Sequence, residues 1–596
     1  MVPAMTGSRP WPERDGADDT ATEVFPRIEP GAARSVGYAL DPATATVEQP
    51  RVAEEPRDDT GASVARHGAV MALGSITSRV TGFVRTAAIG AAIGVAAIGN
   101  DYSLSNTLPG MVYELLLGGV LASVVVPLLV RARSRDTDRG EAYTQRLLSL
   151  AVVFLAGATV IAIACAPLFT RVLANDRTSA PDRDLITTLS YLLLPMIFFY
   201  GMAALFAAVL NTRGHFAMPT FAPILNNLIV IAMAGVLIWI PVANKADARS
   251  LTAGQVAILG LGTAAGIVVQ AIGLWPALRR VGFRWRWRWD FRELHLRELG
   301  RVSIWMLAYV IVSQVAVVVV FKLAQMAADN GTDAAGPAIY NNAFLIFMMA
   351  HGIVAVSVIT ALMPRMAAAA AEQRHEDLVD QLSLGTRLTA VVLVPATVGY
   401  VVLGRPLAVT LFEWGNYGHA AAVATGTVIA LAGLGLVPFA ISQLQLFAFY
   451  AMPDTRTPAL INVPVVALRI GLDLLFYVVL PATLVAAGLM AGNAISFVVA
   501  ALIGYALLRR RIGRLGLTRV LATLGRLGLA GVIAAVVTTV VLLVMTLIWG
   551  DEKAASVIQL AVGALVLVAS YVGAALWLRV HEVKELATMV GSKLRR

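Results

Sequence analysis

Fourteen long apolar runs divide this 596-residue chain. Each run has about twenty or more mostly apolar residues, which is enough to cross the hydrocarbon core of a bilayer as a helix. Charged residues make up only 14% of the chain, against about 25% in ordinary soluble domains. We therefore predict an all-α integral membrane protein with about 14 transmembrane helices. The runs begin near Ala69, Tyr102, Leu147, Leu185, Thr220, Ala253, Val302, Ala335, Leu384, Ala421, Ala459, Leu484, Val520 and Ala554.

Arginine clusters recur in alternate loops of this pattern. They follow the second, sixth and twelfth apolar runs, whereas the intervening loops are short or charge-balanced. Because Lys and Arg accumulate in cytoplasmic loops, we expect both termini on the cytoplasmic side. The protein is then a multi-pass protein of the cytoplasmic (inner) membrane. The clusters are Arg131, Arg133, Arg135 and Arg139, then Arg279, Arg280, Arg284, Arg286, Arg288, Arg292 and Arg297, and finally Arg509, Arg510, Arg511 and Arg514.

The two ends of the chain differ in composition from the apolar runs. The first sixty-five residues contain 6 Arg and no Lys against 12 Asp or Glu, and no long apolar run. We interpret residues 1–66 as a disordered acidic cytoplasmic tail and not as a signal peptide. Residues 581–596 are expected to form a basic cytoplasmic C-terminus.

A faint internal repeat suggests two halves. Asn211-Thr212-Arg213 follows Pro195 at the same offsets at which Asp454-Thr455-Arg456 follows Pro438. Two copies of six helices enter the membrane in the same sense, so a pseudo-twofold axis along the membrane normal would relate them. We predict an N-lobe at 67–283, a basic interfacial linker at 284–298, a C-lobe at 299–511 and two additional helices at 512–580.

Two arginines interrupt the first apolar run. Arg79 and Arg85 would each cost about 3 kcal/mol at bilayer depth, so they require an anionic partner or a hydrated cavity. Helical geometry separates them by about 120° around the axis and about 9 Å along it. Either they line a cavity for an anionic ligand, or they reach toward the headgroups or pair with Glu114 and Asp101 as structural ion pairs.

Several motifs resemble a known family. The segments at 78–85, 195–201, 210–216, 361–366, 411–416 and 449–458 are similar, in order and spacing, to those of the MurJ/MviN lipid II flippases. The resemblance extends from about Ala69 to at least Leu480. It implies the fold of the multidrug/oligosaccharidyl-lipid/polysaccharide exporter superfamily, with two six-helix lobes around a central cavity. The implied activity is moving the lipid-linked peptidoglycan precursor, lipid II, from the inner to the outer leaflet for cell-wall synthesis.

The expected substrate carries a pyrophosphate, and paired guanidinium groups can hold its oxygens. Arg79 and Arg85 are the expected ligands. Many members of the family resemble each other in having further arginines in the second and eighth helices, which this chain lacks. Neutral hydrogen-bond donors occupy these helices instead, namely Asn106, Tyr113, Asn341 and Asn342. Glu114 is expected as a counter-ion of the arginines or as a protonatable gate.

A second charged pair, Arg469 and Asp473, lies in the eleventh apolar run. Their i, i+4 spacing places them on one helix face as a neutralised pair. A packed salt bridge is one interpretation. The family resemblance suggests another, in which Asp473 matches the acidic residue of an ion-coupling site and Arg469 replaces the cation. Transport would then use the membrane potential and not sodium at this position.

Other classes of function find little support. The chain has one cysteine and no zinc spacing, nucleophile elbow or Walker loop, so we expect a transporter and no enzyme, cofactor or metal. The alternation from Arg284 to Trp289 is typical of a membrane boundary and not of nucleic-acid binding. Rival functions are a flippase of another polyprenyl-linked glycan, a drug or cation antiporter, and a membrane scaffold. Beyond the substrate and membrane lipids, candidate partners are cell-wall synthesis or division proteins.

Overall fold

The computed structural model describes residues 60–584 apart from 118–125, 136–137, 139, 241, 245–246, 295, 331–334 and 514. The predicted acidic tail and basic C-terminus therefore lie almost entirely outside the described residues. Within them, the structure contains helices and no strand, as the sequence predicts.

Helices α1 to α10 account for the first six apolar runs. Their packed interior is formed by leucines, alanines and aromatic rings from α1, α2, α4 and α6 to α10. Proline residues divide two of these runs into pairs, α6 with α7 and α9 with α10. The helices are α1 (Thr60–Ile93), α2 (Ala97–Leu117), α3 (Val126–Arg135), α4 (Glu141–Ala164), α5 (Ala166–Leu173), α6 (Ala180–Leu193), α7 (Met196–Thr212), α8 (Ala217–Trp239), α9 (Ala253–Gly273) and α10 (Trp275–Arg280).

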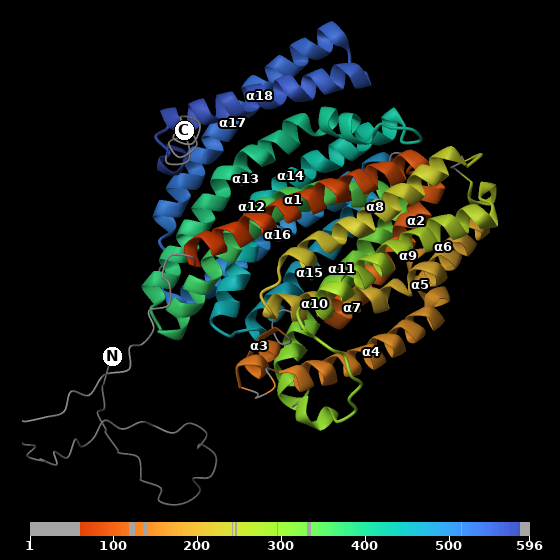
Figure 1. The fold of residues 1–596 in the computed structure, drawn as a ribbon. Helices are drawn as coiled ribbons and strands as arrows, with labels where there is room; N and C mark the ends of the chain where they lie inside the picture. The colour runs from red at the N-terminus through yellow and green to blue at the C-terminus, as the bar shows by residue number, and fades with distance from the viewer. Residues whose placement is uncertain are drawn as a thin grey trace, which may run out of the picture. The chain divides into compact units, whose positions relative to one another are not determined.

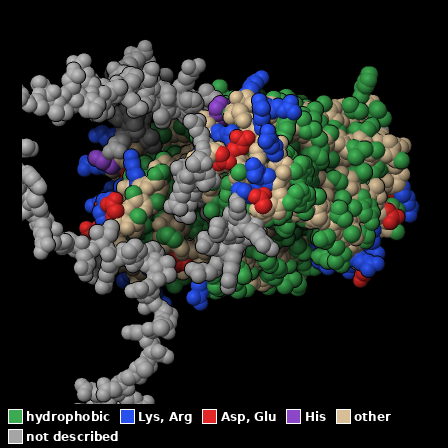
Figure 2. All heavy atoms as spheres, turned by 60° about the horizontal axis from the view of Figure 1, so that its bottom comes forward, with side chains coloured by type: hydrophobic (Ala, Val, Ile, Leu, Met, Phe, Trp, Pro, Cys, Tyr) green, Lys and Arg blue, Asp and Glu red, His purple; other side chains and the backbone are tan. Residues whose placement is uncertain are grey.

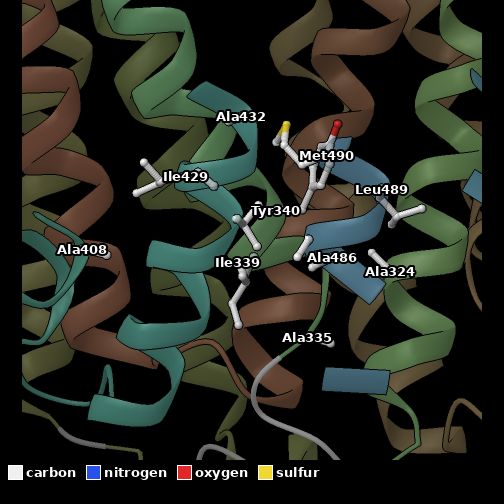
Figure 3. Packing of buried hydrophobic residues seen from close by; sticks show 14 of the residues in the cluster. Ala324, Ala335, Ile339, Tyr340, Ala408, Ile429, Ala432, Ala486, Leu489 and Met490 are labelled. Carbon is white, nitrogen blue, oxygen red and sulfur yellow. The ribbon is translucent and has the colours of Figure 1, made fainter. Parts of the chain in front are cut away.

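Helices α11 to α16 form a second packed group, which surrounds the largest apolar cluster. Ile339 and Tyr340 of α12 point into the space between α14 and α16, where they meet Ile429 and Met490 (Figure 3). The helices are α11 (Leu296–Ala328), α12 (Pro337–Ala371), α13 (His375–Phe412), α14 (His419–Ala451), α15 (Arg456–Val479) and α16 (Ala482–Ile512).

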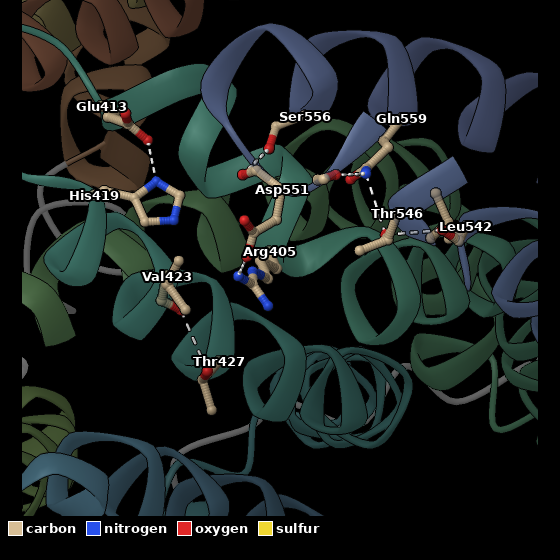
Figure 4. A network of polar contacts seen from close by, with 11 residues as sticks. Arg405, Glu413, His419, Val423, Thr427, Leu542, Thr546, Asp551, Ser556 and Gln559 are labelled. Atoms are coloured by element: carbon tan, nitrogen blue, oxygen red, sulfur yellow. Dashed lines mark hydrogen bonds and ion pairs between the residues drawn. The ribbon is translucent and has the colours of Figure 1, made fainter. Parts of the chain in front are cut away.

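The last two helices, α17 (Leu517–Trp549) and α18 (Lys553–Trp577), lie beside α13 (Figure 1). Ala530 and Ala575 are fully buried in that contact. Polar contacts fix the turn between the two helices, where Arg405 of α13 forms an ion pair with Asp551 (Figure 4). Lys553 also donates to the carbonyl of Glu413. The two C-terminal helices that the sequence predicts are therefore present as α17 and α18.

The predicted count of 14 spans is not confirmed. Twelve helices or helix pairs among the described residues are long and apolar enough to cross a membrane, and α1 and α2 are not among them. The two helices occupy the first two predicted runs, but Arg79 and Arg85 reduce the hydropathy of α1, and Asn100, Asp101 and Asn106 reduce that of α2. On the face shown in Figure 2, hydrophobic side chains cover most of the right half, and charged groups lie mainly from the middle to the left, with a few at the right edge.

Direct hydrogen bonds join the two helix groups at one end. Asn416, in the turn before α14, donates to the carbonyls of Ala91 and Ala92 at the end of α1 (2.8 and 2.9 Å). The side-chain oxygen of Asn100 in α2 accepts from the backbone of Ala338 in α12 (3.1 Å). At the same end, Asn175 and Thr178 donate to Asp329 after α11 (both 2.6 Å). The end at which α1 finishes and α12 begins is therefore closed between the groups.

Replacing Gly426 with alanine should destabilise the protein. A Cβ at Gly426 would lie 2.7 Å from the Gly404 carbonyl oxygen and 2.7 Å from the Cα of Arg405, both of which are backbone atoms of α13. Overpacking of this kind costs about 1–3 kcal/mol. We expect a lower melting temperature in detergent for Gly426→Ala. Gly235→Ala in α8 is the matched control because nothing lies within 4 Å of its added Cβ, and equal melting temperatures for the two variants would contradict the close helix contact.

Candidate functional site

Arg85 lines a cavity of about 140 Å³ between α1, α2 and α12. Asn106 of α2 and Asn341 and Asn342 of α12 line the same cavity. Four residues that the sequence predicted as one site are therefore brought together. The cavity lies near the closed end, because Gly94 after α1 and Ala338 at the start of α12 also line it.

Hydrogen bonds hold the two asparagines of α12 in place. Asn341 donates to the hydroxyl of Ser103 in α2 (3.3 Å), across the two helix groups. Asn342 donates to the hydroxyl of Tyr417 (3.3 Å), which lies 2.6 Å from the hydroxyl of Thr425. Tyr417 is buried, and a Cβ at Gly90 of α1 would lie 2.7 Å from its ring. The amide groups are thus positioned by their neighbours before any ligand arrives.

Arg79 lies apart from this cavity. Its guanidinium group rests against Gly352 of α12, where an added Cβ would overlap it. The backbone of α1 beside Arg79 is fixed to α8, since Asn227 donates to the carbonyl of Ser78 (3.1 Å) and to the hydroxyl of Thr81 (2.9 Å). Arg79 therefore extends from one helix group to the other, about one and two-thirds turns away from Arg85.

Neither arginine pairs with an acidic group in the described part of the chain. The ion pairs found there do not join Arg79 or Arg85 to Glu114 or Asp101. Asp101 is fully buried, and neither of its carboxylate oxygens has a hydrogen-bond partner among the described residues. The two guanidinium groups thus keep their charge available for a ligand.

A second cavity of about 390 Å³ adjoins the first. Asn106 and Asn341 line both cavities, and Tyr113, Glu114 and Arg469 line only the second. The ring of Tyr113 packs 5.6 Å from that of Tyr200. Arg469, which the sequence assigned to a separate site, therefore faces the same space as Glu114.

Arg469 connects this cavity to a buried carboxylate. Its Nε lies 3.7 Å from Oδ2 of Asp473, and it donates to the hydroxyl of Tyr340 (3.1 Å). Asp473 is fully buried, it packs against Gly492 of α16, and its oxygens accept no hydrogen bond from the described residues. The charge of Asp473 is therefore balanced by Arg469 alone within the described part.

Sequence reasoning missed several lining residues. Tyr200, Gln314 and Tyr340 line the second cavity, yet none was predicted. Tyr200 lies inside the motif at 195–201, and Tyr340 directly precedes Asn341, so both could have been predicted from the sequence. Gln314 lies in the apolar run of α11, where a lone polar residue was a usable signal.

Comparisons with solved structures define the class of protein. One similar structure is a "Lipid II flippase MurJ, inward closed conformation", with a TM-score of 0.65 and 17% identity, covering 84% of this chain and 97% of the other. Another, an "inward-facing conformation of a multidrug resistance MATE family transporter of the MOP superfamily", has a TM-score of 0.56 and 16% identity, covering 75% and 99%. The fold is therefore that of these transporters.

Comparisons of sequence define the family. The family model described as "Lipid II flippase MurJ" matches residues 89–561. A "Probable lipid II flippase MurJ" of Synechocystis is 24% identical over 71% of this chain and 78% of its own length. A "Lipid II flippase MurJ" of Burkholderia cenocepacia is 26% identical over 66% and 74%. The chain belongs to the MurJ lipid II flippase family, and as such it is a multi-pass membrane transporter and not an enzyme.

Removing one member of the Arg469 and Asp473 pair should cost more than removing both. Arg469→Met leaves a buried carboxylate without a counter-charge, and breaking a buried ion pair in this way costs about 3–5 kcal/mol. The double variant Arg469→Met/Asp473→Leu should recover most of that loss, because no unpaired charge remains. Melting temperatures of the two single variants and the double variant test the coupling, and purely additive losses would contradict it.

Proposed function

We propose that this chain is a lipid II flippase that moves its substrate from the inner to the outer leaflet by alternating access. Membership of the MurJ family supports the substrate and the direction. The observation that carries the proposal is the pair of adjoining cavities between the two helix groups, with Arg85 in one and Arg469 in the other. In alternating access, the two helix groups move against each other, and the space between them opens to one side of the membrane and then to the other.

Chemical complementarity supports the assignment of roles. The fork of Arg85 matches phosphate oxygens in pairs, and Asn106, Asn341 and Asn342 add neutral donors beside it. Tyr113 and the asparagines suit the hydroxyl and amide groups of a sugar-peptide head. Arg79, about one and two-thirds turns away, would meet the pyrophosphate at another stage of its path. The cavity thus offers few cations and many neutral hydrogen-bonding groups.

We place both termini, and the end of the molecule opposite to the closed end, on the cytoplasmic side. Basic loops support this orientation, since Arg131 to Arg139 follow α2 and Arg509 to Arg511 end α16. The closed end, where α1 finishes at Ile93, then faces outward. We take residues 67–283 and 299–511 as the two moving lobes, with 284–298 as their linker.

We further propose that Arg469 serves as a built-in cation for Asp473. A guanidinium 3.7 Å from a fully buried carboxylate occupies the position that a mobile cation would need. Glu114, in the same cavity, then acts as a gate whose protonation responds to the substrate. Without a required cation at Asp473, transport would use the membrane potential, worth about 2.3 kcal/mol per charge per 100 mV.

Loss of either arginine of α1 should abolish transport while the protein remains folded. In cells depleted of their own flippase, we expect the wild-type chain to restore outer-leaflet lipid II, and Arg79→Ala and Arg85→Ala to fail at equal membrane levels. Arg374→Ala is the matched control because Arg374 is exposed and its acidic partners among the described residues are Glu372 and Asp377. Restoration by both Arg79→Ala and Arg85→Ala would contradict the assigned roles, and failure of the wild type would favour another polyprenyl-linked glycan as cargo.

Sodium should not be required for transport. In proteoliposomes, we expect equal initial rates of lipid II flipping in sodium and in choline buffers at a fixed membrane potential. Collapse of the potential should slow flipping in both buffers. Strict dependence on sodium would contradict the role given to Arg469.

A further inference from the structure

Three tryptophans form a stacked ladder after α10. Residues 283–290 belong to no helix or strand, and the contacts between the rings of Trp285, Trp287 and Trp289 place these alternate side chains on one side, as in an extended segment. Successive ring centroids lie 5.3 and 5.8 Å apart, and the last two rings are nearly parallel, at 14°. The first ring packs 6.1 Å from Trp275 of α10. The outer rings remain open, because Trp287 is 54% and Trp289 66% exposed.

Helix α4 fixes the backbone of this ladder. Gln145, which is buried, donates to the carbonyl of Arg284 (2.7 Å) and accepts from Nε of Arg288 (2.9 Å). The hydroxyl of Ser149, fully buried one turn later, accepts from the backbone N–H of Arg288 (3.2 Å). The extended conformation is therefore set by the protein and does not depend on a membrane to form.

The acidic group of this segment is already neutralised. Asp290 lies 2.6 Å from a guanidinium nitrogen of Arg146 in α4. That hydrogen bond lowers the pKa of Asp290 below its ordinary value, so the pair stays charged on both sides. Because Asp290 is paired with Arg146, it forms no ion pair with the arginines of its own segment in the described part of the chain.

Three cations of the segment remain exposed. Arg280, Arg284 and Arg286 have no acidic partner in the part of the chain that the structure describes. Arg284 and Arg286 share one side of the extended segment, opposite to the tryptophans. Arg279 stacks over the ring of Trp275 at 5.5 Å.

The position of the segment indicates which kind of ligand it binds. One candidate membrane span ends at Arg280 and another begins at Glu141, so the ladder adjoins the ends of two candidate spans, where a membrane boundary is expected. Tryptophan rings favour that depth, and arginine forks bind phosphate oxygens in pairs. An anionic phospholipid offers both partners in one molecule, namely a phosphate beside apolar chains.

We propose that residues 279–289 form a preorganised binding site for anionic phospholipids. Arg284 and Arg286 bind the headgroup phosphate, while Trp287 and Trp289 pack against the glycerol and the upper acyl chains. The site lies on the outer surface of α4 and α10, away from the two cavities between the helix groups. It gives the transporter a fixed contact with the anionic leaflet, independent of its cargo.

Lipid binding to the full-length purified chain tests this site. Native mass spectrometry would measure binding of phosphatidylglycerol and of phosphatidylcholine as the neutral reference. We expect Arg284→Gln/Arg286→Gln to weaken phosphatidylglycerol binding by about fivefold for each arginine and to leave phosphatidylcholine unchanged. The control Arg509→Gln/Arg510→Gln removes two exposed arginines at the end of another span. Equal losses in the two pairs, or no loss in either, would overturn the proposal.

A second variant tests whether the ladder must be held in shape. Gln145→Met keeps all the arginines and tryptophans but removes both hydrogen bonds of Gln145 to the segment. We expect a weaker preference for phosphatidylglycerol at an unchanged melting temperature. An unchanged preference would show that only the net charge matters, and it would refute the preorganised site.

Discussion

The energetic cost of placing two guanidinium groups in α1 constrains the rest of the structure. Arg79 and Arg85 cannot face hydrocarbon, so α1 must border polar space. The neighbouring helices meet this requirement with amide and hydroxyl groups, which line the cavity beside Arg85. Polar residues of α1 and α2 also lower the hydropathy of these two helices, which are not among the candidate spans of the described residues.

Charge in the cavities is sparse, and this suits a carrier that must release its cargo. Arg85 and Arg469 line adjoining spaces, Glu114 lies in the second, and Asp473 offsets part of the charge of Arg469. Neutral donors can orient a large polar head without holding it as strongly as further cations would. The closed end depends on hydrogen bonds such as that from Asn416 to Ala91, which can be exchanged for water when the groups separate.

Much of the helical architecture could be predicted from the sequence, because apolar runs and basic loops report directly on spans. The grouping of Arg85 with Asn106, Asn341 and Asn342 was also predicted, and the structure brings these residues together. Lateral packing was not predictable from one sequence. Nothing in the pattern indicates that Arg79 meets Gly352 or that Arg469 shares a cavity with Glu114, since both depend on how helices far apart in the chain pack.

The most direct test of the account is the affinity of the purified chain for a short-chain polyprenyl pyrophosphate, measured beside the corresponding monophosphate. The account predicts that Arg85→Gln weakens pyrophosphate binding by about 10- to 100-fold, the value of a charge-assisted hydrogen-bonded contact. It also predicts that the preference over the monophosphate falls, while Arg374→Gln changes neither quantity. Unchanged pyrophosphate affinity in Arg85→Gln would contradict the claim that this arginine binds the substrate.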